Sequence, residues 1–101
     1  MNATYEMLSE CFDAVWRWVA DGGQMDVEGA PAGDYARIAL DNINSVLFAI
    51  REKGATPAAQ AVQQLQSAVD TLTSAGVASL DSMCALLEAS KALKENMEQN
   101  R

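Results

Sequence analysis

Apolar residues recur along most of the chain with the spacing of amphipathic helices. On a helix of 3.6 residues per turn, side chains at i, i+3, i+4 and i+7 share one face. Leu8, Val15 and Val19 follow this spacing in the first periodic stretch. Three further stretches repeat the pattern, so it predicts four helices, over residues of about 4–20, 33–53, 57–75 and 79–97.

Glycine and proline fall between these stretches and indicate where helices end. Gly54, Thr56 and Pro57 stand in the order expected for a helix stop, an N-cap and a first helical residue. Gly76 suits the end of the third helix, and Ser79 suits the N-cap of the fourth. The alternative is that one unbroken helix runs through Gly76. Short turns place the second and third helices side by side. The pattern therefore predicts an all-α fold, a small up-and-down antiparallel bundle of four helices in one domain.

The longest break in the periodic pattern predicts a loop over residues of about 21–33. The segment contains glycines and Pro31 and has neither helical nor strand periodicity. Loops of this length between bundle helices are uncommon and are either functional or mobile. We expect Met25 and Val27 to pack beneath the loop, with Asp26 and Glu28 pointing outward.

The formal net charge of −7 is unevenly distributed over the 101 residues. Residues 1–36 carry seven acids and one base, whereas residues 37–101 carry seven acids and six bases. An acidic balance disfavours direct binding of DNA, RNA or an anionic membrane, because such binding depends on lysine and arginine neutralising phosphates. A basic partner protein would be attracted instead.

The chain contains no run of about 18 apolar residues and no secretory start, so we expect a cytoplasmic protein, in the bacterial host if it is phage-encoded. Cys11 and Cys84 fall on apolar helix faces. Two cysteines without a secretory signal are typical of buried thiols rather than of a disulfide.

Catalytic and metal-binding patterns are absent from the sequence. There is no histidine, which removes catalytic triads and most zinc and di-iron sites. Gly22 and Gly23 follow a helix and lack the lysine of a phosphate-binding loop. The acids of the predicted loop lack the spacing of a calcium-binding EF-hand. We therefore expect no catalytic residues, no cofactor and no metal, and a protein that is not an enzyme.

Candidate partner-binding residues are those that fit a monomeric bundle poorly. The first helix carries an apolar arc of about 200°, so either Trp16 or Trp18 is expected to touch a partner, unless both cap the core of the chain itself. Ile38 and Phe48 fall on a polar face of the second helix. We expect them to contact a partner, unless the first helix or its loop covers them. With the acids of the loop region, the predicted partner-binding residues are Trp16, Trp18, Asp21, Asp26, Glu28, Asp34, Ile38 and Phe48.

Two classes of function suit these features. The first is a non-enzymatic protein-interaction module, a small acidic adaptor or stoichiometric inhibitor of another protein. A sharper version presents carboxylates where a basic nucleic-acid-binding protein expects phosphates, as phage anti-defence proteins such as anti-CRISPRs and nucleic-acid mimics do. The alternative is a self-associating structural bundle, a homodimer in which a symmetry mate completes the aromatic face, or a chaperone-like escort protein.

Overall fold

Four helices and one short pair of strands make up residues 3–29 and 31–97, the part of the chain that the computed structural model describes. The helices are α1 (Ala3–Ala20), α2 (Ala32–Lys53), α3 (Ala59–Thr73) and α4 (Leu80–Met97). The strands are β1 (Gln24–Met25) and β2 (Val77–Ala78). The predicted all-α bundle is confirmed, and it measures 43 × 22 × 19 Å.

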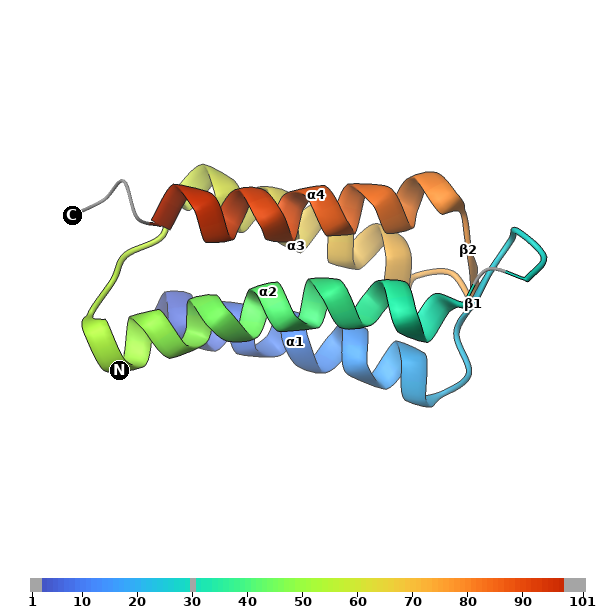
Figure 1. The fold of residues 1–101 in the computed structure, drawn as a ribbon, viewed down its shortest axis with the longest axis horizontal. Helices are drawn as coiled ribbons and strands as arrows, with labels where there is room; N and C mark the ends of the chain where they lie inside the picture. The colour runs from blue at the N-terminus through green and yellow to red at the C-terminus, as the bar shows by residue number, and fades with distance from the viewer. Residues whose placement is uncertain (1–2, 30, 98–101) are drawn as a thin grey trace.

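The helices alternate in direction, but their neighbours differ from those that the short turns predict. α1 and α3 run one way along the long axis, and α2 and α4 run back (Figure 1). α1 packs against α2 and α3, and α4 packs against the same two helices. α2 and α3 are therefore antiparallel but lie diagonally across the bundle, which corrects the prediction that they are packed neighbours. The extended connection of residues 54–58 is long enough, at about 16 Å, to make this crossing.

A parallel strand pair explains this arrangement. Gln24 pairs with Val77 and Met25 with Ala78, so β1 and β2 lie side by side immediately after α1 and α3. The Asp26 N–H donates to the Ala78 carbonyl oxygen at 2.8 Å. Because both strands point the same way, α1 and α3 must approach the pair side by side. Residues 21–33 are therefore not one loop, since they contain a turn, β1 and the start of α2 at Ala32.

The side chain of Trp18 joins the two halves of the bundle at the strand pair. Its indole Nε1–H donates to the Ala75 carbonyl oxygen at 2.8 Å, and the residue is only 7% exposed. The chain then turns sharply, and the Gly23 N–H donates to the Trp18 carbonyl oxygen at 2.8 Å. A Cβ on Gly23 would lie 2.7 Å from that oxygen and closer still to the indole ring. Glycine is thus required at position 23 by the close approach of Trp18.

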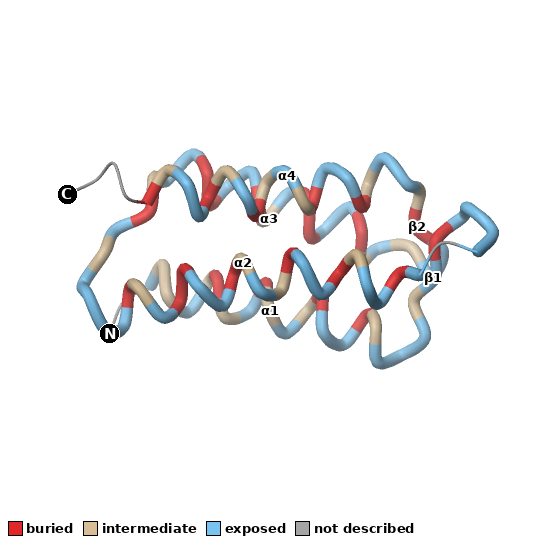
Figure 2. Tube along the Cα trace, viewed as in Figure 1, coloured by how far each residue is buried: buried red, intermediate tan, exposed pale blue. Residues whose placement is uncertain are grey.

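The core is formed by the apolar face of each helix, as the spacing of apolar residues predicts. Buried positions face the middle of the bundle on all four helices (Figure 2). The largest side chains that are almost fully buried include Leu8, Ile43, Leu65, Leu72, Met83, Leu86 and Leu93. The prediction of a buried thiol at Cys84 is wrong, because Cys84 lies on the outer side of α4 and is exposed, as is Leu80 at 41%.

Helix ends agree with the predicted caps at two positions. Gly54 has a φ of 65° and its N–H donates to the Ile50 carbonyl oxygen, so it ends α2 in the left-handed conformation. Ser79 caps α4, because its Oγ accepts the Ser82 N–H at 3.0 Å. In contrast, Gly76 does not end a helix. α3 stops at Thr73, and Gly76 belongs to the segment leading into β2, where its carbonyl oxygen accepts the Gln24 N–H.

The boundaries of two other helices also differ from the prediction. α3 begins at Ala59 rather than at Pro57, which is buried in the extended connection before the helix. α2 begins at Ala32, with extended Pro31 at its N-cap position, so Asp34 lies in the first turn instead of capping the helix. The last residues of the predicted fourth helix agree with Met97, the end of α4.

We expect Gly23→Ala to destabilise the fold by about 1–3 kcal/mol, because the added methyl group meets a fixed carbonyl oxygen as well as the indole. Urea unfolding followed by tryptophan fluorescence measures this change in the free energy of unfolding. Gly76→Ala is the matched control, since a Cβ there meets nothing within 4 Å. The control is expected to stay within about 1 kcal/mol of the parent protein, and equal effects of both substitutions would contradict the account.

Candidate functional site

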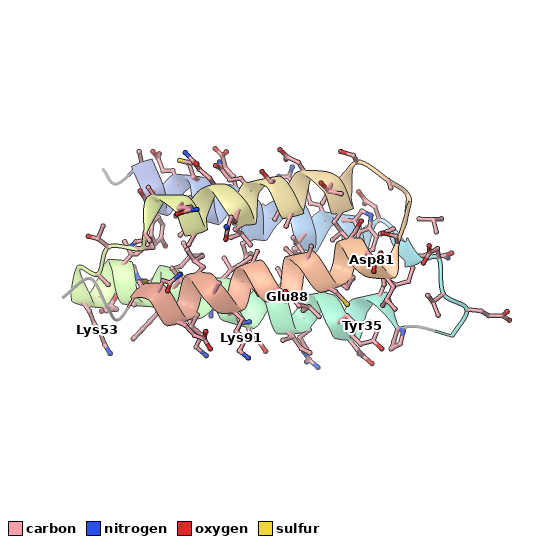
Figure 3. All side chains as sticks on the ribbon, turned by 90° about the horizontal axis from the view of Figure 1, so that it is seen from above. Tyr35, Lys53, Asp81, Glu88 and Lys91 are labelled. Carbon is pink, nitrogen blue, oxygen red and sulfur yellow. The ribbon has the colours of Figure 1, made fainter. Side chains whose placement is uncertain are left out.

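Five exposed acidic residues lie at the end of the bundle that carries the strand pair. Asp21 follows α1, Asp26 and Glu28 lie in the loop after β1, Asp34 lies in the first turn of α2, and Asp81 lies in the first turn of α4. Figure 1 shows that these segments meet at one end of the long axis, and Figure 3 shows Asp81 there. We call these five residues the acidic end. The structure thus brings together the four predicted acids and adds Asp81, which is not among the predicted partner-binding residues.

The carboxylates of the acidic end are exposed and lie close to helix ends. Asp34 and Asp81 sit at helix N-termini, where the partial positive charge of the helix dipole stabilises a negative charge. Arg17 and Arg37 are the nearest bases along the chain, in the last turn of α1 and near the start of α2. Within the described residues, no ion pair joins either arginine to these acids. The carboxylates therefore remain available to a partner.

Exposed apolar side chains lie among these acids. Val27 is 44% exposed in the loop between Asp26 and Glu28, and Val77 is 57% exposed in β2. Leu80, next to Asp81, is exposed as well. None of the three is among the predicted partner-binding residues, and Val27 was expected beneath the loop instead of at the surface. Val27 and Val77 lie near Gly29 and Gly76 in segments without periodicity, which is the only sequence signal of their exposure, whereas Leu80 begins a periodic stretch and has no such signal.

The four apolar candidates of the sequence analysis have three different locations. Trp18 lies in the core and is only 7% exposed, so its surface is not accessible to a partner. Trp16 is 57% exposed on α1, away from the core face. Ile38 and Phe48 are both about half exposed on α2, and they line the same groove. The first helix and its loop do not cover these two residues, which leaves them at the surface of the described structure.

This groove lies between α2 and α4 and has a volume of about 1000 Å³. Its walls include Ile38 and Phe48 on α2 and Lys91 and Lys94 on α4, and Lys53 lies where α2 ends. We call it the α2–α4 groove. Across it, the Asn42 Nδ2 donates to the buried Ser90 Oγ at 3.1 Å, and this bond ties the two helices together. Figure 3 shows Lys53 and Lys91 projecting on the same side of the molecule.

The lining of the α2–α4 groove is basic, although the protein as a whole is acidic. Its lining contains three lysines, Lys53, Lys91 and Lys94, against one acid, Glu95. In the part of the chain that the structure describes, no ion pair neutralises these lysines. Lys53 and Lys94 also lie in the last turns of their helices, where a positive charge complements the helix dipole.

The two cysteines lie in contrasting environments. Cys11 is buried on α1, and Cys84 is exposed on α4. Burial raises the pKa of the Cys11 thiol from 9.0 to about 11, with smaller contributions from the negative charges of Asp70 and Glu10. Both cysteines are free thiols, so no disulfide joins them. A buried thiol with a raised pKa is a poor nucleophile, which makes Cys11 a packing residue.

The described residues also bear on metal binding and membrane insertion. Among residues 3–29 and 31–97, no group of three or more cysteine, aspartate or glutamate side chains is arranged to hold a metal ion. None of the helices in those ranges is both long and apolar enough to cross a bilayer.

Comparisons with known proteins do not assign a family. No protein-family model, no curated protein and no solved structure matches the chain significantly. Function must therefore be inferred from the acidic end, the α2–α4 groove and the exposed apolar residues.

The cysteine environments predict that a thiol reagent modifies one site in the folded protein. At pH 8, iodoacetamide should label Cys84 and leave Cys11 unreacted, because the raised pKa lowers the thiolate fraction of Cys11 by about 100-fold and burial blocks access. Peptide mass spectrometry assigns the labelled residue. Both cysteines should react in urea, which serves as the control. Fast labelling of Cys11 in the folded protein would show that the core around α1 is open.

Proposed function

We propose that this chain is a non-enzymatic protein-interaction module, a small acidic adaptor or stoichiometric inhibitor that binds a basic surface of another protein through its acidic end. The observation that carries the proposal is the meeting of five exposed carboxylates from four separate segments at one end of the bundle. Such a concentration of charge attracts a positively charged partner and accelerates the encounter.

The apolar residues at this end support a protein rather than a small ion as the ligand. Val27, Val77 and Leu80 offer hydrophobic area next to the carboxylates. Specific protein interfaces combine an apolar centre with a polar or charged rim, and these three side chains could form such a centre beside the carboxylates. A small cation would gain nothing from these three side chains.

A partner that normally binds nucleic acid suits this surface best. Its lysines and arginines are arranged to neutralise phosphates, and carboxylates on a rigid bundle end can occupy the same positions. Inhibition would then follow from occupancy alone, without catalysis or a cofactor. This mode of action is that of an anti-CRISPR or another nucleic-acid-mimicking anti-defence protein in the cytoplasm of a bacterial host.

Charge reversal tests the proposal. Tagged parent protein and the triple variant Asp26→Lys, Glu28→Lys, Asp34→Lys are used to capture partners from a host lysate at low and high salt. We expect the parent to retain a nucleic-acid-binding protein at low salt and to lose at least about 90% of it at high salt, because the charges are screened. The triple variant should capture less than about a tenth as much at low salt, since three reversals turn attraction into repulsion.

The matched control is Glu6→Lys, Glu10→Lys, Asp13→Lys, which changes the net charge by the same amount on the exposed side of α1. Capture by this control should remain within about twofold of the parent, because its reversals lie away from the acidic end. Equal losses in both triple variants would mean that overall acidity, and not the acidic end, attracts the partner.

Self-association is the second candidate, and the 57% exposure of Trp16 favours it. Light scattering on the same samples separates the two ideas. A stable dimer that captures no other protein, and that Trp16→Ala converts to a monomer, would support a structural homodimer over an adaptor. A chaperone-like escort would instead retain a partner at both salt concentrations, because apolar contacts are insensitive to screening.

A further inference from the structure

We propose that the α2–α4 groove is a second interaction surface, which binds an amphipathic helix with acidic flanks from a partner protein. The proposal is independent of the acidic end, because the residues concerned are different and the charge has the opposite sign. It would make the chain an adaptor with two surfaces, one for a basic partner and one for an acidic helix.

The apolar lining of the groove includes two large, half-exposed side chains on one helix. Ile38 and Phe48 are ten residues apart on α2, a separation of about 15 Å along the helix axis. Large apolar side chains that line a groove can supply the hydrophobic contacts of a partner helix, whose own apolar stripe spans a similar distance in about three turns. Covering Ile38 and Phe48 would also remove their exposed apolar area from water.

The lysines of the groove determine which charge is favoured beside the apolar stripe of the bound helix. Since α2 and α4 are parallel and Asn42 bonds to Ser90, Lys91 and Lys94 lie beside the α2 segment between Asn42 and Phe48. An apolar anchor and these lysines therefore face the same occupant. Glutamate or aspartate beside its apolar stripe would pair with the lysines, whereas lysine or arginine would be repelled.

The acidity of the whole protein does not prevent this attraction. Lys53 and Asp81 lie toward opposite ends of a molecule 43 Å long (Figure 3). At physiological ionic strength the Debye length is about 8 Å, so the acidic end is screened from a ligand in the groove. Local lysines then determine which ligand binds.

The shape of the groove favours a helix over other acidic ligands. From Ile38 to Lys53 the groove wall is about 22 Å long, which matches a helix of about 15 residues. A nucleic acid would also meet the lysines, but the two large apolar side chains, Ile38 and Phe48, offer it no phosphate contacts. An extended peptide would find no strand to pair with among the described residues that line the groove, which belong to α2, α4 and the start of the connection after α2.

Binding of defined peptides tests this proposal. The probes are two fluorescent helical peptides of about 16 residues with the same apolar stripe, one flanked by glutamates and one by lysines. Fluorescence anisotropy gives the dissociation constants, and amide chemical shifts locate the binding site. We expect the glutamate peptide to bind at least about tenfold more tightly than the lysine peptide, with shifts concentrated on α2 and α4.

Two pairs of variants separate groove binding from general effects. Lys91→Glu is compared with Arg37→Glu, which has the same change of charge at an exposed position of α2 outside the groove lining. Phe48→Ser is compared with Trp16→Ser, which removes a similarly exposed aromatic residue from α1. Lys91→Glu and Phe48→Ser should each weaken binding of the glutamate peptide about tenfold, and the controls should change it less than about twofold. Circular dichroism confirms that each variant is folded.

Several results would overturn the proposal. These are no binding of the glutamate peptide at about 1 mM, equal affinity for both peptides, or shift changes outside the groove. A concentration-dependent doubling of mass that Phe48→Ser abolishes would identify a second copy of the chain as the occupant instead. Lysine-dependent sedimentation with phosphatidylglycerol vesicles would identify a lipid surface. Loss of partner capture at the acidic end would leave the peptide result unchanged, so failures of the two proposals are distinguishable.

Discussion

The junction at which Trp18 and the parallel strand pair join two helical hairpins determines the arrangement of the whole bundle. β1 and β2 lie side by side in parallel, and the indole of Trp18 donates a hydrogen bond across to the Ala75 carbonyl oxygen. These contacts place the ends of α1 and α3 together. α2 and α4 then leave the same end in the same direction and pack along each other, so that the connection between α2 and α3 must cross the diagonal.

This arrangement separates the charges of the protein. The N-termini of α2 and α4 lie at the strand end, where acids in their first turns are favoured, and their C-termini lie together at the other end, where lysines are favoured. In a bundle where α2 and α4 were diagonal, Lys53 and Lys94 would not border one groove. The strand pair is therefore the structural reason that one surface of a strongly acidic chain is basic, and it links the fold to both proposed interactions.

Helical periodicity was sufficient to predict the four helices and nearly all of the core, because burial of one face dominates the pattern of each helix. The break in that pattern, together with the uneven charge, indicated Asp21, Asp26, Glu28 and Asp34, which meet in space because α1 ends where α2 begins. The strand pair was missed, since two residues per strand produce no periodic signal. Without that pair, neither the core position of Trp18 nor the parallel packing of α2 on α4 follows from the pattern. For the same reason, the groove between those helices was not anticipated, although Ile38 and Phe48 were recognised as misfits.

Amide hydrogen exchange at Asp26 is the most direct measurement of whether the junction holds the two hairpins together. The Asp26 N–H donates across to β2, whereas Glu28 lies two residues further along the same loop and has no such backbone bond among the described residues. We predict that the Asp26 amide exchanges as slowly as amides in the middle of α2, such as that of Val46, because it opens only when the bundle opens. Exchange of Asp26 at the rate of Glu28 would show that the strand pair opens independently, and it would contradict the account of how the helices and charges are arranged.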